Sequence, residues 1–354
     1  MQAFGCFLEL HVDFLGGLSI IEMVNIGKKE MSRMFSPRAD RHMKTKIDLT
    51  NMRVVLLAAG LCCFLWGSAA PAIKIGYRLF QIDSADTASI LMFAGIRFAL
   101  AGFLVVLYHS VTSGRWIMPP KGSGMAIISL ALTQTVLQYL FYYIGLSHAS
   151  GVNSAIITGT NVFFSMLCAS LVFRYEKLDA HKIVGCILGF LGIVIVNLAG
   201  SGPEGGLSIS FLGEGFVLMA QIFYAISGSL IKKHSRLFDV VTLSGYQFMA
   251  GGMLLFVIGS VSGGTLSGAV GFSAFALLMY LGVLSAVAYT LWGVLLKYNP
   301  VSRVTVFGFM NPVFGVILSA IFLGESGQAL TWNTLAALVL VCLGIYVVNR
   351  EKKQ

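Results

Sequence analysis

The sequence predicts an all-α integral membrane protein whose ten transmembrane helices form two inverted five-helix repeats. Three observations predict this fold class: an apolar composition, a duplicated sequence pattern and an alternating distribution of basic residues. The chain has 354 residues, of which 57% are hydrophobic and only 11% are charged, whereas a soluble domain carries about 25% charged residues. Because so few charges could not cover a water-facing surface, we expect the chain to lie in a lipid bilayer.

Ten apolar segments are long enough, or nearly so, to cross the hydrocarbon core, which takes about 20 helical residues. We expect helices because the bilayer offers the backbone no other hydrogen-bond partner, and because the segments lack the period-two alternation of strands. The expected spans are 54–73, 88–108, 125–146, 152–173, 183–199, 211–231, 240–260, 273–296, 304–323 and 331–348.

The two halves of the chain carry the same pattern. Residues 94–98 read Ala-Gly-Ile-Arg-Phe and residues 244–248 read Ser-Gly-Tyr-Gln-Phe, and each half closes on Gly-Ile-x-x-Val-Asn, at 192–197 and 344–349. Each copy contains five spans, an odd number, so the second copy must enter the membrane upside down relative to the first. Inverted repeats of this kind are typical of secondary transporters.

Lys and Arg residues predict the orientation of the spans. The connections between spans lie alternately on the two sides of the membrane. Those on one side hold only Arg78, with Lys74 near one helix end. Because cytoplasmic loops carry the excess of Lys and Arg, we expect a multi-pass protein of the cell membrane with both termini in the cytoplasm. The basic residues of the alternate connections and the C-terminal tail are Arg115, Lys121, Arg174, Lys177, Lys182, Lys232, Lys233, Arg236, Lys297, Arg303, Arg350, Lys352 and Lys353.

The chain divides into two repeats and an N-terminal extension. We expect the repeats at 53–200 and 211–350, and an extension at 1–52 that belongs to neither. Acidic residues interrupt the apolar stretch of the extension, which makes its insertion into the membrane unfavourable. Either it is a cytoplasmic segment, or translation starts at Met43, and we favour the later start.

Several classes of function lack their sequence signature. The net charge of +9 comes from short groups between apolar runs, so we expect no nucleic-acid partner. The sequence has no HExxH, Walker A or nucleophile-elbow motif, and its Cys residues form no CxxC pair. We therefore expect no enzyme activity, catalytic residue, metal or cofactor. Glu214 is the one carboxylate within an expected span, so proton coupling through an intramembrane relay is poorly supported.

Short motifs connect the chain with a known transporter family. They are Leu-Trp-Gly-Ser at 65–68, the corresponding hinges at 145–150 and 295–300, and the run from Asn311-Pro312 to Gly324-Glu325. On these residues the chain resembles the ten-span EamA-type members of the drug/metabolite transporter superfamily, over about residues 53–350.

The resemblance implies a function and an arrangement of helices. It implies export of small metabolites or drugs across the cytoplasmic membrane by alternating access, with spans 1–4 and 6–9 around a cavity and spans 5 and 10 at the periphery. The first copy departs from the motif, because Phe163 or Val162 stands at the position of Pro312 and 173–176 replaces Leu-Gly-Glu. The alternative is a lipid-linked substrate flippase, or a membrane-embedded enzyme or scaffold.

Arg97 lies near the middle of its expected span, where a guanidinium costs at least about 2.5–3.5 kcal/mol. It must therefore face a wet cavity, a partner or backbone carbonyls. We expect it either to bind an anionic group of a small-molecule substrate, with Gln247 as its neutral counterpart in the second repeat, or to act as a structural clamp.

A polar stripe marks the third span. Gln134, Gln138 and Tyr142 recur every four residues, which places them on one helical face, and Tyr289 is the counterpart of Gln138 in the second repeat. We expect the stripe to line a substrate path, with interhelical hydrogen bonding as the alternative. Further mid-span candidates for substrate contact are Asn161, Asn311 and, with packing as the favoured interpretation, Trp66 and Trp292.

Prolines and charged residues are candidate hinges or gates. A Pro within a span frees a carbonyl and permits bending. For a Lys that ends the first helix of a repeat we expect snorkelling to the interface, with gating as the alternative. For a Glu before the last helix of a repeat we expect capping or gating. These candidates are Pro71, Pro312, Lys74, Lys232, Glu176 and Glu325.

Small residues recur on the fifth span. Gly185, Gly189 and Gly192 form a small-residue surface, which predicts close packing against another helix. That helix belongs either to the same chain or to the partner in a homodimer.

Overall fold

The computed structural model describes residues 48–149, 154, 157–199, 210–267, 271–323 and 332–350. Residues 1–47 of the N-terminal extension, which include Met43, and Glu325 lie outside these ranges, so the expectations about them stay predictions. Every regular element in the described ranges is helical, and six of the described helices are long and apolar enough to cross a membrane, accompanied by three shorter apolar ones. The all-α membrane fold class is confirmed.

The first repeat contributes five helical segments. The first two are continuous α-helices, whereas the third and fourth contain π-helical turns. The segments are α3 (Met52–Leu79), α4 (Thr87–Ser113), α5–η1–α6 (Gly124–Leu130, Ala131–Leu137, Gln138–His148), α8–η2 (Asn161–Leu167, Cys168–Val172) and α9 (Ala180–Ala199).

The second repeat contributes five more, and its fourth segment changes from α to 3₁₀ and back. The segments are η3–α10 (Phe211–Gly215, Phe216–His234), α11 (Val240–Val261), α12 (Phe272–Tyr298), α13–η4–α14 (Val301–Thr305, Val306–Phe309, Met310–Leu323) and α16 (Trp332–Asn349). Several helices continue beyond the expected apolar runs, because charged residues at span ends can extend a helix into the interface.

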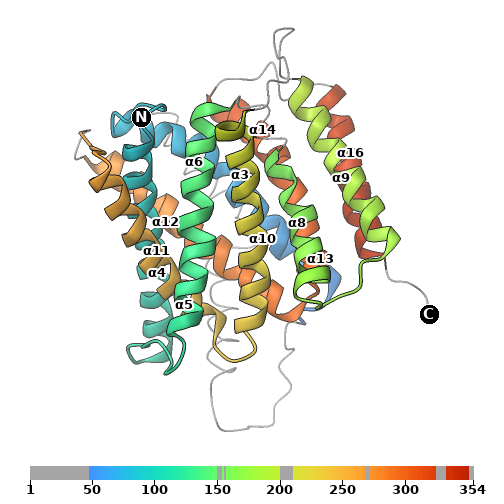
Figure 1. The fold of residues 1–354 in the computed structure, drawn as a ribbon, viewed down its shortest axis with the longest axis horizontal. Coiled ribbons are helices and arrows are strands. Elements are labelled where there is room, and N and C mark those ends of the chain that lie inside the picture. Colours follow the sequence, from blue (N-terminus) through green and yellow to red (C-terminus); the bar gives the residue numbers. More distant parts are fainter. Residues whose placement is uncertain are drawn as a thin grey trace.

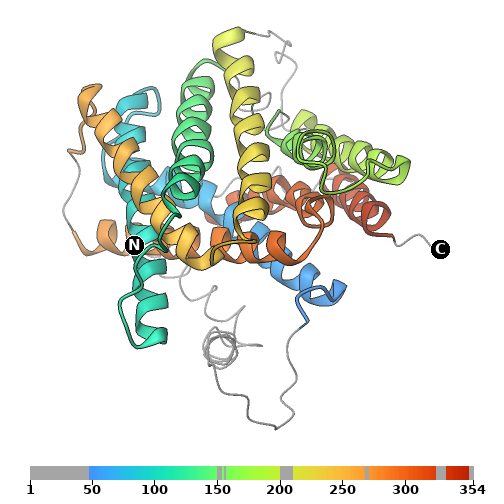
Figure 2. The ribbon, with the colours of Figure 1, turned by 60° about the horizontal axis from the view of Figure 1, so that its bottom comes forward.

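The repeats run in opposite directions through the bundle. In Figure 1, α3 rises from the lower end and α10 descends to it. We call this lower end, where α4, α10 and α12 finish, the basic end, because its connections carry Arg115, Lys121, Arg174, Lys233 and Arg236. Figure 2 shows α3 crossing the bundle obliquely beneath the other helices.

The second helices of the two repeats, α4 and α11, pack at backbone contact. A Cβ added to Gly252 would lie 2.2 Å from the amide nitrogen of Ala99, and one added to Gly102 would lie 2.4 Å from the carbonyl oxygen of Gly245. Glycines recur every seven residues on each of the two helices, so one face of each helix carries no side chains at these positions. The α4–α11 pair therefore joins the two repeats, and it stands at the left side of the bundle in Figure 1.

The last helices of the repeats, α9 and α16, stand together at one side of the bundle (Figure 1). A Cβ added to Gly185 would lie 2.7 Å from the carbonyl oxygen of Gly344, and one added to Gly192 would lie 2.8 Å from that of Ala337. The small-residue surface of α9 is thus covered by a helix of the same chain, which favours the intrachain alternative. The pair also occupies the peripheral position that the family resemblance implies for spans 5 and 10.

Candidate substrate-binding site

Arg97 lies on α4 with only 4% of its surface exposed. Its guanidinium carbon is 4.4 Å from the ring centroid of Phe98 and 5.8 Å from that of Tyr139. Its Nε is buried and makes no hydrogen bond, and no ion pair among the described residues includes it. Arg97 is therefore a buried cation that contacts two aromatic rings and has no ion pair within the described part of the chain.

Tyrosines from three other helical segments surround this cation. Tyr77 of α3, Tyr139 and Tyr143 of α6 and Tyr289 of α12 are its electrostatic neighbours. The hydroxyls of Tyr139 and Tyr289 form a 2.5 Å hydrogen bond. Because α6 and α12 belong to different repeats, this bond joins the repeats beside Arg97.

Two tryptophans extend the aromatic surroundings. The ring of Trp66 packs edge-on against Tyr289 at 5.1 Å and against Trp292 at 5.0 Å, and its indole Nε1 is buried without a hydrogen bond. We call Trp292, Trp66, Tyr289 and Tyr139 the aromatic row. The structure brings three of the sequence candidates, Trp66, Trp292 and Tyr289, together in this row and joins it to Arg97 through Tyr139.

The counterpart of Arg97 has a different environment. The Gln247 side-chain amide donates to Oε1 of Gln134 at 3.0 Å, and its own oxygen accepts from the Thr135 hydroxyl at 3.1 Å. Both glutamines are buried. These bonds favour the interhelical interpretation of Gln134 and Gln247 over direct contact with a substrate.

The rest of the polar stripe lies just beyond a π-helical turn. Gln134 belongs to η1, and Gln138 begins α6. The Oε1 of Gln138 is buried without a hydrogen bond, and the ring of Tyr142 lies 5.7 Å from that of Tyr143. A π-helical turn inside an α-helix often marks a functional position, so both residues stay candidates for the substrate path.

The two candidate asparagines lie where the fourth spans of the repeats are interrupted. Asn161 begins α8 after a turn at Thr160, and its Oδ1 lies 3.6 Å from where a Cβ of Gly308 would be. Asn311 follows the 3₁₀ turn η4, and its Oδ1 is buried without a hydrogen bond. Pro312 has no N–H for the carbonyl of Gly308. Interrupted helices at corresponding positions of two repeats are typical of transporter binding sites.

Three of the candidate gating residues have clear positions in the structure. Pro71 is buried within α3, which continues through it to Leu79. Lys74 is exposed at the end opposite the basic end. Lys232, its counterpart at the basic end, donates from Nζ to the carbonyl of Leu296 at 2.9 Å and to that of Asn299. In this structure the Lys232 ammonium binds helix-end carbonyls, and snorkelling to the interface stays a prediction.

Glu176 connects the repeats at the basic end. Its carboxylate accepts from the backbone N–H of Ser302 at 2.9 Å, from the Ser302 hydroxyl, and from Nζ of Lys182 at 2.7 Å. Sequence predicts capping of the following helix, α9, but the carboxylate caps α13. Arg174, two residues before Glu176, has a left-handed φ of 54°. We call Glu176, Lys182, Lys232 and Ser302 the basic-end clamp.

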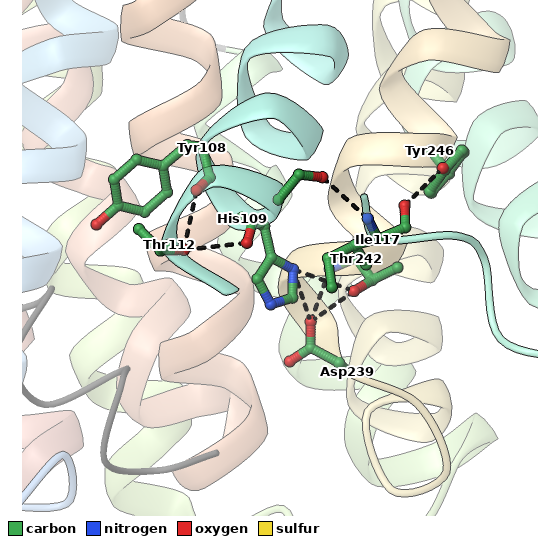
Figure 3. Close-up of polar contacts among 8 residues, drawn as sticks. Tyr108, His109, Thr112, Ile117, Asp239, Thr242 and Tyr246 are labelled. Atoms are coloured by element: carbon green, nitrogen blue, oxygen red, sulfur yellow. Dashed lines mark hydrogen bonds and ion pairs between the residues drawn. The ribbon is translucent and has the colours of Figure 1, made fainter. Parts of the chain in front are cut away.

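A second buried polar cluster was missed by sequence reasoning (Figure 3). His109 of α4 lies 3.3 Å from the Thr242 hydroxyl and 3.8 Å from the carboxylate of Asp239, through Nδ1 in both cases. Asp239 caps α11 by accepting from the Thr242 N–H at 2.8 Å. His109 stands seven residues after Gly102, so the heptad of small residues on α4 was the signal that could have placed it against α11.

The other end of α4 is also tied to the second repeat. Asp86 caps α4 and accepts from the hydroxyl and the backbone N–H of Ser89, and these hydrogen bonds hold the pKa of Asp86 below its usual value. The Ser89 hydroxyl in turn accepts from the N–H of Thr265 at 2.8 Å. Polar contacts at both ends therefore hold the helix that carries Arg97.

Comparison with known proteins decides the family. The model of the EamA-like transporter family matches residues 53–198 and again 211–350. The chain belongs to the EamA-like transporter family. The two matches have the same order and nearly the same bounds as the repeats expected from sequence.

Relatives of this EamA-like transporter come from distant organisms. An uncharacterized transporter of Archaeoglobus fulgidus is 27% identical over 84% of this chain and 99% of its own length. The uncharacterized transporter YvbV of Bacillus subtilis is 26% identical over 86% and 94%. The uncharacterized inner membrane transporter YedA of Escherichia coli K12 is 26% identical over 80% and 89%. The chain is a multi-pass membrane protein of a transporter family.

A solved crystal structure has a similar fold. It superposes with a TM-score of 0.66 over 84% of this EamA-like chain and 96% of its own, at 15% sequence identity. At this identity the likeness concerns the fold alone.

Proposed function

We propose that this protein is a secondary transporter that exports a small metabolite or drug across the cytoplasmic membrane by alternating access. Its termini lie in the cytoplasm in this proposal, since the basic end carries the Lys and Arg excess that marks cytoplasmic loops. The observation that carries the proposal is Arg97, a buried cation between the repeats for which the described residues provide no carboxylate.

An unpaired guanidinium inside a membrane points to a ligand. Its burial costs several kcal/mol unless a partner compensates, and the buried Nε of Arg97 lacks a hydrogen bond. The clamp alternative requires a carbonyl or carboxylate at the guanidinium N–H groups, whereas the contacts of the guanidinium within the described part of the chain are the faces of Phe98 and Tyr139. An anionic group of the substrate would supply the missing charge and hydrogen bond together.

The basic-end clamp supports alternating access. Glu176 and Lys232 hold the connection between α12 and α13 from two sides, and on the proposed orientation they close the cytoplasmic side. The counterpart of Lys232 in the first repeat is Lys74, at the opposite end. Glu325, the counterpart of Glu176, lies outside the described residues. In an inverted-repeat transporter the two halves exchange conformations as access alternates, so we expect Lys74 to become buried when the clamp opens.

The proposal is tested by reconstituting the full chain in proteoliposomes with a panel of metabolites, with and without a proton gradient. We expect flux of at least one solute in wild-type vesicles and none with Arg97→Gln, while folding and topology are intact. Lys233→Gln removes one charge from an exposed basic-end residue and is the matched control. The absence of flux for every solute, or flux restricted to lipid-linked compounds, would overturn this proposal.

A further inference from the structure

We propose that Arg97 and the aromatic row form one site for an organic anion that carries an aromatic ring, with the anionic group at Arg97 and the ring against Trp66. This inference rests on the proposed function and specifies its substrate class. It uses two buried donors that lack partners in the structure, Nε of Arg97 and Nε1 of Trp66, and the rings that connect them.

The charge requirement comes from Arg97. A guanidinium presents its N–H groups in a planar fork that fits the two oxygens of a carboxylate. In surroundings of low dielectric constant such a charge-assisted pair is stronger than in water. Because Arg97 is 4% exposed and has aromatic neighbours, a neutral ligand would leave the charge uncompensated. The site therefore selects an anion.

The ring requirement comes from the row. Phe98 lies against the Arg97 guanidinium at 4.4 Å and against the Tyr139 ring at 4.6 Å, and Tyr139 bonds to Tyr289, which packs against Trp66. A ligand held at Arg97 thus meets aromatic faces and edges toward Trp66. Aromatic pairs in edge-on or offset geometry contribute more binding free energy than their buried area alone accounts for. The unpartnered Nε1 of Trp66 would donate to an acceptor on the ring.

The repeat symmetry indicates one such site per chain. On the other side of the pseudo-dyad Gln247 is neutral, and Gln134 and Thr135 satisfy its amide. The residue of the second repeat that matches Gln134 is Ser285, whose short hydroxyl cannot form the amide pair. Arg97 therefore lacks the internal partner that Gln247 has in Gln134.

The test uses purified full-length protein and three probe compounds: 4-hydroxyphenylacetate, its neutral amide, and cyclohexylacetate. Calorimetry gives affinity and stoichiometry, and proteoliposomes give flux. We expect one 4-hydroxyphenylacetate per chain, bound at least about tenfold more tightly than its amide, since a charge-assisted hydrogen bond is typically worth this factor or more. It should bind about twofold to tenfold more tightly than cyclohexylacetate, since an aromatic pair contributes beyond its buried area.

Variants separate the two requirements. Arg97→Gln should abolish the preference for the acid over the amide, and Arg97→Lys should restore part of it. Trp66→Leu should abolish the preference for the aromatic over the cyclohexyl acid and keep the preference for the acid over the amide. Lys233→Gln should change neither preference. The wild-type preferences test the proposal even where a variant does not fold.

Each outcome is decisive. Equal affinity of wild-type protein for the acid and the amide, or for the aromatic and cyclohexyl acids, overturns this inference. Flux of a cationic or neutral solute with no anion bound overturns it too, but leaves the transporter proposal standing. No flux of any solute in the metabolite panel overturns the transporter proposal itself.

Discussion

The carboxylate of Glu176, in the first repeat, accepts a 2.9 Å hydrogen bond from the backbone N–H of Ser302, in the second. Ser302 is the second residue of α13, where a helix has unsatisfied N–H groups and a positive dipole end. The Ser302 hydroxyl and Lys182 contact the same carboxylate. A charge of one repeat therefore completes a helix of the other at the basic end.

Glu176→Gln should loosen the basic end. The amide keeps the shape of the carboxylate but loses charge-assisted bonds that contribute about 1.5–3 kcal/mol each. We expect faster hydrogen exchange in peptides that cover 300–305, measured by mass spectrometry in detergent or nanodiscs. The control is Lys177→Gln in the same loop, where the side chain is exposed. Unchanged exchange at Ser302 would show that the clamp does not hold α13.

Gln134 and Gln247 should be coupled in a double-mutant cycle. Their side chains bond at 3.0 Å between η1 and α11, and such intramembrane bonds contribute on average about 0.6 kcal/mol. We expect Gln134→Ala and Gln247→Ala each to lower the free energy of unfolding, with less than additive loss in the double variant. Additive effects together with lost ligand binding at full stability would instead assign these glutamines to the substrate.

Gly252→Ala should disrupt the α4–α11 pair. The added Cβ would lie 2.2 Å from the backbone nitrogen of Ala99, so the helices must separate, at a cost of about 1–3 kcal/mol. A lower melting temperature of the purified protein measures this loss. The control is Gly60→Ala in α3, where a Cβ meets nothing within 4 Å and Ala is a better helix former. Equal melting temperatures for the two variants would contradict the packing described.

Acid should weaken the start of α4 through Asp86. The hydrogen bonds from Ser89 lower the pKa of this carboxyl below its usual 3.8. A group with a depressed folded pKa contributes stability above its unfolded pKa and loses it as the pH falls through the folded value. We expect Asp86→Asn, which keeps an acceptor at the cap, to reduce the fall in melting temperature below about pH 4. Identical pH profiles would rule out this contribution.

Properties of single spans could be predicted from the sequence. Hydropathy predicted ten segments, because the bilayer imposes apolar composition and helical hydrogen bonding on each span separately. The odd number of spans per copy predicted inversion, and the model of the EamA-like family matches both copies. Arg97 stood out for the same reason, since a cation in an apolar run is costly whatever its neighbours are.

Contacts between spans needed the tertiary structure. Only the packing of α11 on η1 showed that Gln247 pairs with Gln134, and only the tertiary structure showed that the Glu176 carboxylate bonds to α13 instead of α9. The pairing of His109 with Asp239 and the row from Trp292 to Tyr139 likewise join residues far apart in the chain. The sequence by itself determined which residues cross the membrane, because that depends on local transfer from water to lipid. The tertiary structure alone decided which of them meet, because that depends on how helices rotate and pack against one another.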